Sequence, residues 1–398
     1  MRTTGMWAKR GVAVLAVWAV SLGTGAQHAS AAPKVITKKT LAPGVVYQQI
    51  TDTAVPYRAY TVEFDPVQPA TFDTVLSASQ IGTFARSSTM AANVGALAAI
   101  NGDLNDWPGR PTHQFVTDGV VAQTGSRPGI SFGFRRDERG GSIGYHPLVI
   151  TARDAQAGTS VRVVSWNTET PATDQVVGYS GYGGKYEKPG TNQCSVRLAS
   201  PSALRWNAKH VGVGRDYTVD AVRCSSSTAM TVTTGTVVLS AKLSGKGATF
   251  VKSMRVGGTV HVGWSNGMSD AMDVISGNAL ILKNGVTQFA SSCTADICDR
   301  NPRTAIGITA TGHVILLVVD GRSSGSPGMT LYQLGREMKL LGAVDAMNLD
   351  GGGSATMWIK GMGVVNHPTD SSGERAVSNA IVILPGSDAS EPAPRAAR

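Results

Sequence analysis

Three segments of the chain place aspartate or asparagine beside glycine directly after a run of apolar residues. They are residues 98–103, 318–322 and 346–354. Polar side chains on glycine-rich loops at strand ends are where sheet proteins commonly carry catalytic groups. Because alternate side chains of a strand share a face, Asn348 and Asp350 should point the same way, and Asn101 and Asp103 likewise. A single Asp-Gly pair is typical of an ordinary turn, so it is the recurrence that favours a catalytic site.

The run Gly351, Gly352 and Gly353 has a further use. Backbone without Cβ atoms can approach a ligand closely, and consecutive N–H groups can form an anion-binding nest. Arg303 enters the strand before the one that ends at Asp320, where a guanidinium could bind phosphate through two hydrogen bonds. A surface salt bridge is the ordinary alternative for this arginine. The sequence requires no cofactor, although the Asp and Asn oxygens would suit Ca²⁺ or Mg²⁺.

A serine hydrolase motif competes for the same region. Residues 321–325 match G-x-S-x-G around Ser323, and Asp350 and His367 follow in the order of a serine triad. That motif needs a helix to start at once, whereas Ser326, a proline and a glycine come before the next predicted helix. A serine esterase that uses Ser323 is therefore the alternative, not the main hypothesis.

The N-terminal segment predicts a protein that is exported from the cell. A basic start, a short apolar run and Ala29-Ser30-Ala31 predict a signal peptide over residues 1–31, followed by a secreted chain with no stable membrane insertion. The net charge of +9 is diffuse, which argues against nucleic acid and favours anionic partners. Four cysteines in an exported chain predict two disulfides; three pairings are open, and sequence order favours Cys194–Cys224 and Cys293–Cys298.

Hydrophobic patterns predict an α+β fold that is mainly β, with mixed sheets, a few short helices and one prominent packed helix over about 329–342. Apolar residues recur at helical spacing from Leu331 to Leu341, Thr330 and Gln333 have capping-box spacing, and Gly342 can end the helix. Strand-like residues on both sides of this helix allow a crossover connection, with part of the sheet parallel. A short helix is expected over 88–95.

We expect one catalytic domain over 32–385, with a β-rich central insertion over about 140–265 and a disordered tail over 386–398. The insertion shows many short strands bounded by Gly, Asn, Asp and Ser and no sustained helical period. The sequence leaves the oligomeric state open.

Taken together, several motifs resemble the phosphodiester glycosidase family. They keep the family's order, cover roughly residues 47–384, and are most specific between 347 and 356. The matching segments are residues 99–102, 132–137, 273–285, 303–307, 320–321 and 347–356. One departure is the segment from Asp103 to Asp106, where the family usually has a second glycine and aromatic residues, so the sugar-facing loop should differ.

The resemblance implies hydrolysis of a sugar-1-phosphodiester, between the anomeric carbon and the phosphate oxygen, in a cell-surface or extracellular phosphoglycan. The phosphate leaves as a stable anion, so the site needs cations for the phosphate and a carboxylate for the oxocarbenium-like carbon. Asp320 and Asp350 are the expected nucleophile or base and its partner, with Asn348 and Asn101 beside them. The expected substrate-binding residues are Asp103, His113, Arg303, Thr304, Arg322, Gly351, Gly352, Gly353, Ser354 and Arg375. A non-catalytic protein that binds phosphoglycans is the remaining alternative.

Overall fold

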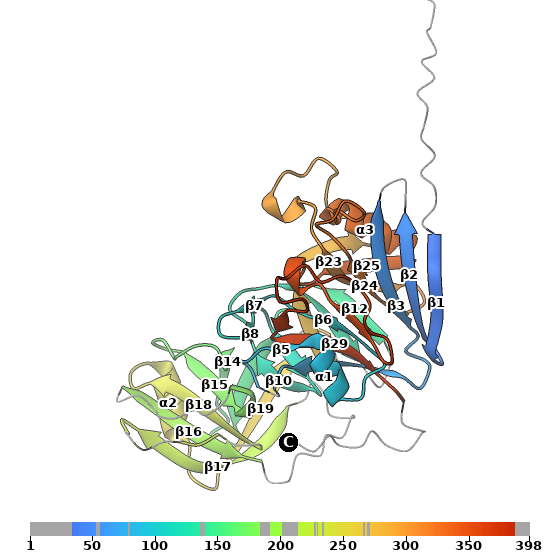
Figure 1. The fold of residues 1–398 in the computed structure, drawn as a ribbon. Coiled ribbons are helices and arrows are strands. Elements are labelled where there is room, and N and C mark those ends of the chain that lie inside the picture. Colours follow the sequence, from blue (N-terminus) through green and yellow to red (C-terminus); the bar gives the residue numbers. More distant parts are fainter. Residues whose placement is uncertain are drawn as a thin grey trace, which may run out of the picture.

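The computed structural model describes residues 34–386 except 53–55, 79, 136–139, 184–191, 201–213, 227, 229, 233–234, 266 and 269–270. The predicted signal peptide and nearly all of the predicted tail therefore lie outside the described residues. Strands dominate the described part of the chain, which also contains three α-helices, so the predicted α+β, mainly β fold is confirmed (Figure 1). None of the described helices is long and apolar enough to span a membrane.

The main sheet has eight strands and carries two of the three predicted site loops. Its order is β1 (Lys34–Ala42), β2 (Val45–Asp52), β3 (Tyr57–Phe64), β24 (Val314–Val319), β23 (Arg303–Thr309), β25 (Ala343–Asn348), β21 (Ala279–Lys283) and β22 (Val286–Thr287). The crossover from β24 to β25 is present, but these strands do not pair with each other, and the parallel pair of the described strands lies between β14 (Ser160–Trp166) and β15 (Val176–Ser180). Strand β23 lies between these two strands and pairs antiparallel with both. Strands β24 and β25 therefore run in the same direction and end at the same edge of the sheet.

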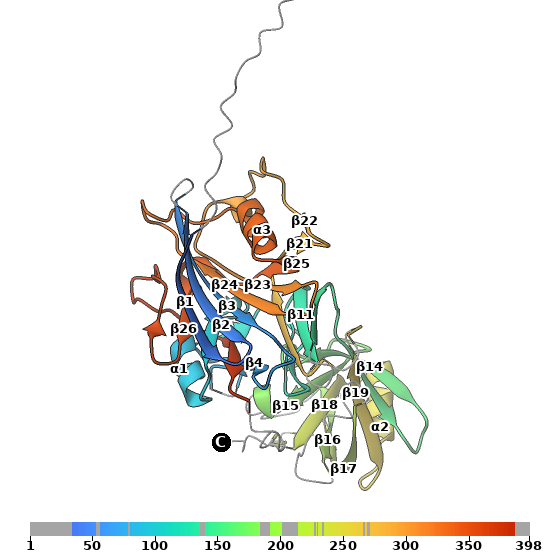
Figure 2. The same ribbon diagram turned by 90° about the vertical axis from the view of Figure 1, so that its right-hand side faces the viewer.

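The prominent helix forms where the sequence predicts it, as α3 (Leu331–Leu340), and covers one face of the main sheet (Figure 2). Thr330 Oγ1 accepts from the Gln333 N–H at 3.1 Å, and Gln333 Oε1 accepts from the Thr330 N–H at 3.0 Å. This reciprocal capping box satisfies two donors that the first turn would otherwise leave unpaired. Gly342 follows the helix at φ 98°, a backbone angle that favours glycine. The predicted short helix is α1 (Ser87–Asn93).

Two further sheets pack against the main sheet and share one apolar core with it. One has the order β10 (Val120–Gln123), β9 (Phe115–Thr117), β20 (Asp273–Gly277), β11 (Ile130–Arg135) and β12 (Gly140–Gly144); the other is β27 (Gly363–Val364), β26 (Met357–Ile359), β6 (Ala98–Asn101), β29 (Asn379–Leu384) and β4 (Thr71–Leu76). Phe64, Phe72, Phe132 and Phe134 come from all three sheets, and their ring centroids lie 4.9–6.4 Å apart in successive contacts. Hydrogen bonds of Asn101 join the end of β6 to the loop after β25 and to the start of β23.

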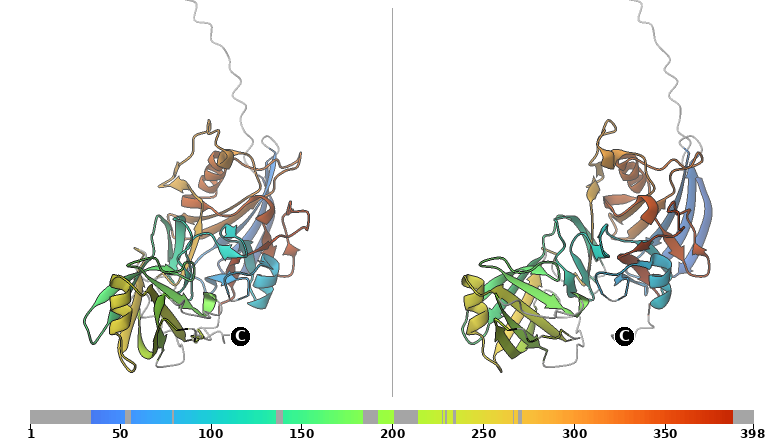
Figure 3. Two further views of the ribbon diagram at one scale, coloured as in Figure 1. Left: turned by 90° about the vertical axis from the view of Figure 1, so that its left-hand side faces the viewer. Right: turned by 60° about the vertical axis from the view of Figure 1, so that its left-hand side comes forward.

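A closed barrel stands to one side of these sheets (Figure 3). Its strands, in order around the barrel, are β13 (Val149–Asp154), β14 (Ser160–Trp166), β15 (Val176–Ser180), β18 (Thr236–Lys242), β16 (Gln193–Ala199), β17 (Arg215–Cys224) and β19 (Thr259–Ser265). The barrel has its own apolar core and is packed by α2 (Lys246–Ser253). The chain leaves the second sheet after β12 and returns into β20, and both of these strands pair with β11. The domain boundaries themselves stay a prediction.

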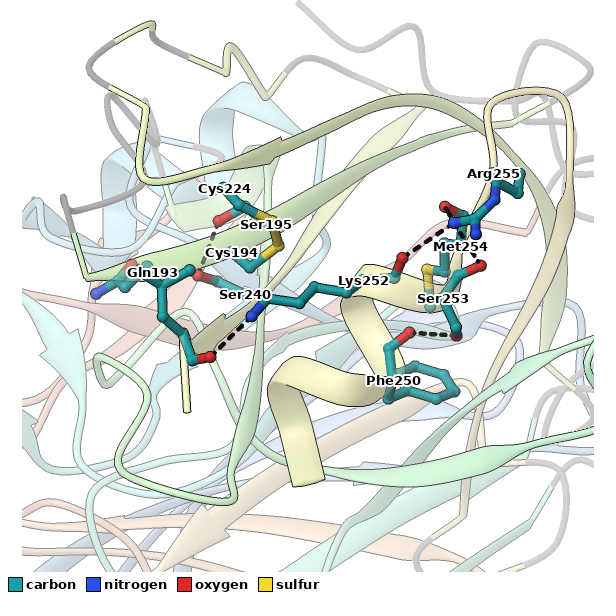
Figure 4. Close-up of a disulfide and its surroundings, with 11 residues drawn as sticks. Gln193, Cys194, Ser195, Cys224, Ser240, Phe250, Lys252, Ser253, Met254 and Arg255 are labelled. Carbon is teal, nitrogen blue, oxygen red and sulfur yellow. Dashed lines mark hydrogen bonds between the residues drawn. A yellow bond between two sulfur atoms is a disulfide. The ribbon is translucent and has the colours of Figure 1, made fainter. Parts of the chain in front are cut away.

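Both predicted disulfides are present. Cys194 and Cys224 are opposite each other on β16 and β17 and join these barrel strands near α2 (Figure 4). Cys293 and Cys298 close a short loop between β22 and β23, at the edge of the main sheet. The sequence-order pairing is confirmed, and no cysteine is free.

Candidate active site

Asn101 joins the ends of three strands. Its Nδ2 donates to the Asp350 carbonyl at 2.7 Å, and its Oδ1 accepts from Thr304 Oγ1 at 2.7 Å and from the Thr356 N–H at 3.1 Å. Asn101 and Thr304 are fully buried. The predicted group of Asn101, Thr304 and Asp350 is therefore assembled, but its first two members position the Asp350 loop.

Asp350 is a buried carboxylate on the glycine loop, and its surroundings change its pKa. Burial raises the pKa of Asp350 to about 6, and the negative charge of Asp103 adds to this rise. Hydrogen bonds from Ser354 and from the Gly351 N–H, and the positive charge of Arg375, act in the opposite direction. A carboxyl group that ionises near neutral pH can serve as a base or nucleophile.

Asn348 lies at the end of β25, two residues before Asp350. Its Nδ2 donates to Asn278 Oδ1 at 2.8 Å and to the Leu349 carbonyl at 2.7 Å, and its side chain is 1% exposed. Its buried Oδ1 has no hydrogen-bond partner within the described part of the chain. These contacts give Asn348 a role in shaping the turn that carries Asp350.

The glycine run 351–353 does not present a set of free N–H groups for an anion. The missing Cβ atoms instead leave room for two arginine side chains. The N–H groups of Gly351, Gly352 and Ser354 already donate to Asp350 Oδ1, the Pro302 carbonyl and the Gly351 carbonyl. A Cβ at Gly352, where φ is 58°, would lie 3.1 Å from Arg322 Nη2, and a Cβ at Gly353 would collide with the Arg375 guanidinium. An anion at this loop would therefore meet the two guanidinium groups first.

The segment 366–375 lies beside the glycine loop. It binds Arg322 and ends with Arg375. Arg322 donates to Thr369 Oγ1 and to Asn301 Oδ1, each at 3.3 Å. Arg375 donates through Nε to Asp370 at 2.7 Å and through Nη1 to Ser354 Oγ at 3.4 Å. Hydrogen bonds from Ser372 and Arg375 lower the pKa of Asp370 to about 2, so this carboxylate stays ionised. Sequence reasoning identified Arg322 and Arg375 but missed the segment that orients them.

Asp320 supports a histidine. Its Oδ1 accepts from the His367 N–H at 2.8 Å, and its Oδ2 lies 3.2 Å from His367 Nδ1 and accepts from Tyr60 Oη at 3.1 Å. Arg58 Nε is 3.6 Å from the same oxygen. Asp320 is 2% exposed, whereas the His367 side chain is 70% exposed. This arrangement makes Asp320 a positioning residue for His367, whose other ring nitrogen can exchange a proton.

Asp103 and His113 form a second, buried pair. Asp103 Oδ1 lies 2.7 Å from His113 Nδ1, and Oδ2 accepts from the His113 N–H at 2.8 Å. The Asp103 N–H donates to Asn379 Oδ1 at 2.8 Å. Burial raises the pKa of Asp103, and the contacts with His113 oppose that rise. The pair closes the base of the loop between the two residues and places a carboxylate near Asp350.

Arg303 does not have the arrangement expected of a phosphate ligand. Its Nε donates to the Met329 carbonyl at 3.0 Å, and its Nη2 donates to the Ile297 and Asp299 carbonyls at 2.9 and 2.5 Å. The side chain is 5% exposed, and burial lowers its pKa to about 10. These contacts favour a structural role, in which Arg303 fixes the loop closed by Cys293 and Cys298.

Comparisons with known proteins bear on the same part of the chain. The family model described as phosphodiester glycosidase matches residues 210–384, which include Asp320, Asp350 and the 366–375 segment. This part of the chain is similar to the phosphodiester glycosidase family. The resemblance found in the sequence motifs is thereby confirmed.

Individual relatives of the phosphodiester glycosidase domain are distant. The chain is 37% identical over 104 residues to the SPbeta prophage-derived uncharacterized protein YomE of Bacillus subtilis (strain 168). The aligned residues make up 26% of this chain and 16% of that protein. It is 29% identical over 113 residues to the N-acetylglucosamine-1-phosphodiester alpha-N-acetylglucosaminidase of Bos taurus. These residues make up 25% of this chain and 21% of that protein. The matches thus span only about a fifth of these relatives.

The fold is shared more widely than the sequence. A solved structure of a hypothetical protein from Synechocystis superposes with a TM-score of 0.67 at 17% identity, over 88% of this chain and 64% of that chain. At this level of identity the similarity concerns the fold alone.

The serine hydrolase alternative gains no support from the geometry of the phosphodiester glycosidase domain. Ser323 and Ser326 bond each other's backbone at 3.2 Å, and Ser323 Oγ donates to the Ser326 carbonyl. His367 bonds Asp320, and among the described residues no hydrogen bond joins His367 to Ser323 or Asp350. A tight turn separates β24 from α3, so the strand-to-helix elbow that a nucleophilic serine needs is not formed.

The described residues contain no group of three or more His, Cys, Asp or Glu side chains that could hold a metal ion. The carboxylates of Asp103, Asp320 and Asp350 instead accept hydrogen bonds from protein groups. The Ca²⁺ or Mg²⁺ option stays a prediction without a candidate ligand set.

Proposed function

We propose that this protein is a secreted phosphodiester glycosidase that hydrolyses a sugar-1-phosphodiester in a cell-surface or extracellular phosphoglycan. The observation that carries the proposal is the grouping at the glycine loop. Asp350, with a pKa of about 6, lies on the same loop as Gly352 and Gly353, against which the guanidinium groups of Arg322 and Arg375 pack. A carboxylate beside two cations fits a substrate that develops positive charge at C1 and carries negative charge on its phosphate.

The reaction then follows from the residues present. The C1–O bond breaks, its electron pair leaves with the phosphate, and a phosphomonoester departs between Arg322 and Arg375. Ionised Asp350 either attacks C1 or takes a proton from the water that attacks it. Net addition of one water gives a free sugar and a phosphomonoester. The leaving group is stable as an anion, so no strongly acidic residue has to protonate it.

His367 supplies a second proton-exchange group near this loop. Asp320 binds its Nδ1 side, which leaves Nε2 free to exchange a proton with water or with the phosphomonoester. Asp320 thus contributes to the proposed reaction through His367, while Asp350 acts on the sugar. Within the expected pair of nucleophile or base and its partner, Asp350 takes the first role and Asp320 the second.

A substrate screen with matched variants tests the proposal. Purified protein should release sugar from sugar-1-phosphodiesters and not from ordinary aryl glycosides. Asp350→Asn should lower kcat by about 10³-fold or more, without lowering the melting temperature at pH 7, because it removes a carboxylate that burial disfavours. Ser323→Ala should be nearly silent. Loss of turnover in Ser323→Ala with full activity in Asp350→Asn would replace the proposal with the esterase, and binding without turnover would leave a phosphoglycan-binding protein.

A further inference from the structure

An exposed tryptophan stands at the tip of the loop that starts at Asp103. The side chain of Trp107 is 88% exposed, and its ring centroid lies 6.1 Å from that of Phe84, which is 37% exposed. Large aromatic side chains are usually well buried, because their apolar surface is costly to keep in water. An exposed aromatic pair of this kind offers an apolar surface on which a ligand ring can stack.

The tip is held rigidly in place. Residues 103–113 form a small hairpin, with β7 (Asn105–Asp106) paired to β8 (Arg110–Pro111). The Asp106 carboxylate accepts from Thr112 Oγ1 at 3.2 Å and from Ser126 Oγ at 2.9 Å. Gly109 accepts from the Gly82 N–H at 3.0 Å and packs so closely on Thr83 that a Cβ would collide with the Thr83 backbone. The backbone that carries Trp107 is therefore held in place, and the indole lies next to Phe84.

The hairpin begins at the candidate active site. Its base is the buried pair of Asp103 and His113, and the charge of Asp103 acts on Asp350. Trp107 is four residues from Asp103, so their Cα atoms lie within about 14 Å of each other. An aromatic surface this close to Asp103, whose charge acts on Asp350, is within reach of a neighbouring sugar of the same glycan.

Phe84 reaches the site by a different route. It directly precedes β5 (Ala85–Arg86), which pairs with β28 (Ala376–Val377), and β28 directly follows Arg375. Two separate segments, one ending at β5 and one forming the hairpin, thus each bring one aromatic residue to the same place. Such convergence favours a ligand subsite over two unrelated surface residues.

We propose that Trp107 and Phe84 form a sugar-binding subsite, on which a pyranose ring of the glycan stacks through its C–H face while Asp350 acts at the cleaved linkage. The inference rests on the proposed function, because it assigns this aromatic surface to the same substrate. Aromatic faces bind the apolar side of a sugar ring and leave its hydroxyl groups in water. The subsite selects sugars attached next to the phosphodiester, and Asp350 and the arginines act on the linkage itself.

Two substrates of different length distinguish binding at this subsite from binding at the reacting centre. One is the methyl phosphodiester of a monosaccharide-1-phosphate, and the other carries further sugars on both sides of the same linkage. Trp107→Ala should raise the KM for the long substrate by about tenfold relative to the KM for the short one, the loss expected for one aromatic contact. Trp107→Phe should recover most of the difference, and Tyr145→Ala, an exposed aromatic on another loop, should match the wild type.

Calorimetry with Asp350→Asn measures glycan binding without turnover and keeps the two proposals apart. Binding of the long substrate that Trp107→Ala weakens about tenfold supports the subsite even if no hydrolysis is found. Hydrolysis by the wild type with the same ratio of KM values in Trp107→Ala would overturn the subsite and leave the proposed function intact. Binding to phospholipid vesicles that depends on Trp107, without binding to the glycan, would also overturn it.

Discussion

The ionisation of Asp350 sets the pH range in which the proposed hydrolysis can run. Burial and the charge of Asp103 raise its pKa to about 6, and Arg375 and two hydrogen bonds limit that rise. Only the ionised carboxylate can act as nucleophile or base, so activity should be lost as the pH falls through this value.

The pH profile can therefore be shifted in both directions. In the wild type, kcat/KM should rise with pH up to about 6 and then level off. Asp103→Asn removes a negative neighbour, so the rising limb should move to lower pH. Arg375→Ala removes a positive neighbour, so the limb should move to higher pH, whatever happens to KM. The same limb in all three proteins would show that Asp350 is not the titrating group.

The recurrence of Asp or Asn beside Gly at strand ends singled out Asn101 and Asp350 in the sequence, and Thr304 followed from the family resemblance. The partners of Asp320 could not be found in this way. Tyr60 and Arg58 lie about 260 positions earlier in the chain, on a strand with no unusual sequence. Only the sheet order, which places β3 beside β24, brings them to Asp320. The carbonyl partners of Arg303 could not be predicted for a similar reason, since no residue type marks a backbone acceptor.

At the scale of elements, the segment 366–375 connects the sheet edge to the glycine loop. His367 is bound to Asp320, Thr369 to Arg322, and Asp370 to Arg375. Glu374 accepts from the N–H and hydroxyl of Ser88 at the start of α1. Contacts at both ends of the segment therefore hold the two arginines in place.

Variants of Asp320 and His367 should affect stability and catalysis differently, because Asp320 positions His367 and His367 exchanges the proton. Asp320→Asn removes charge-assisted bonds at a buried position and should lower the free energy of unfolding by about 1–3 kcal/mol, along with activity. His367→Ala should change the free energy of unfolding by less than about 0.5 kcal/mol, because the side chain is largely exposed, but should lower kcat by about 10²-fold. Denaturant titration and steady-state kinetics measure the two effects. Full kcat in His367→Ala would remove this residue from the mechanism.

Helix α3 offers a test of the core with a control on the same helix. Leu334 is fully buried, whereas Leu340 is 64% exposed. Leu334→Ala should lower the free energy of unfolding by about 2–5 kcal/mol, because it leaves a cavity between helix and sheet. Leu340→Ala should stay within about 0.5 kcal/mol of the wild type. Equal effects in denaturant titrations would mean that the helix does not pack on the sheet by this face.

The helix was predictable because its signals are local. Apolar spacing, a capping pair and a terminal glycine all lie within fifteen residues or so of one another. The pairing of its flanking strands was not predictable, because β23 is inserted between β24 and β25 by contacts that no local pattern records. The same limit applies to the barrel, whose strands are recognisable as strands but whose closure depends on distant pairings.

At the scale of the whole molecule, the two disulfides belong to different parts. Cys194–Cys224 joins two strands of the barrel. Cys293–Cys298 closes a loop in the main-sheet part, and Arg303 donates to the Ile297 carbonyl inside this loop and to the Asp299 carbonyl just after it. The first lies away from the candidate site, and the second lies beside it.

Removing each disulfide should therefore have a different consequence. The double variant Cys194→Ser with Cys224→Ser should lower the free energy of unfolding by about 3–4 kcal/mol, because the disulfide no longer restricts the unfolded chain between two residues 30 positions apart. The folded fraction should keep its kcat. Cys293→Ser with Cys298→Ser should lower kcat/KM by about tenfold through displacement of the loop, at a smaller loss of stability. Thermal melts and kinetics on both double variants measure this. Identical activity losses would contradict the separate placement of the two bonds.

The bond that breaks is the central claim, and hydrolysis in H₂¹⁸O tests it most directly. Cleavage between C1 and oxygen places the label in the released sugar and leaves the phosphomonoester unlabelled, which mass spectrometry of the two products distinguishes. The account predicts label in the sugar for the wild type and no products for Asp350→Asn. Label in the phosphate would show attack at phosphorus and would contradict a glycosidase.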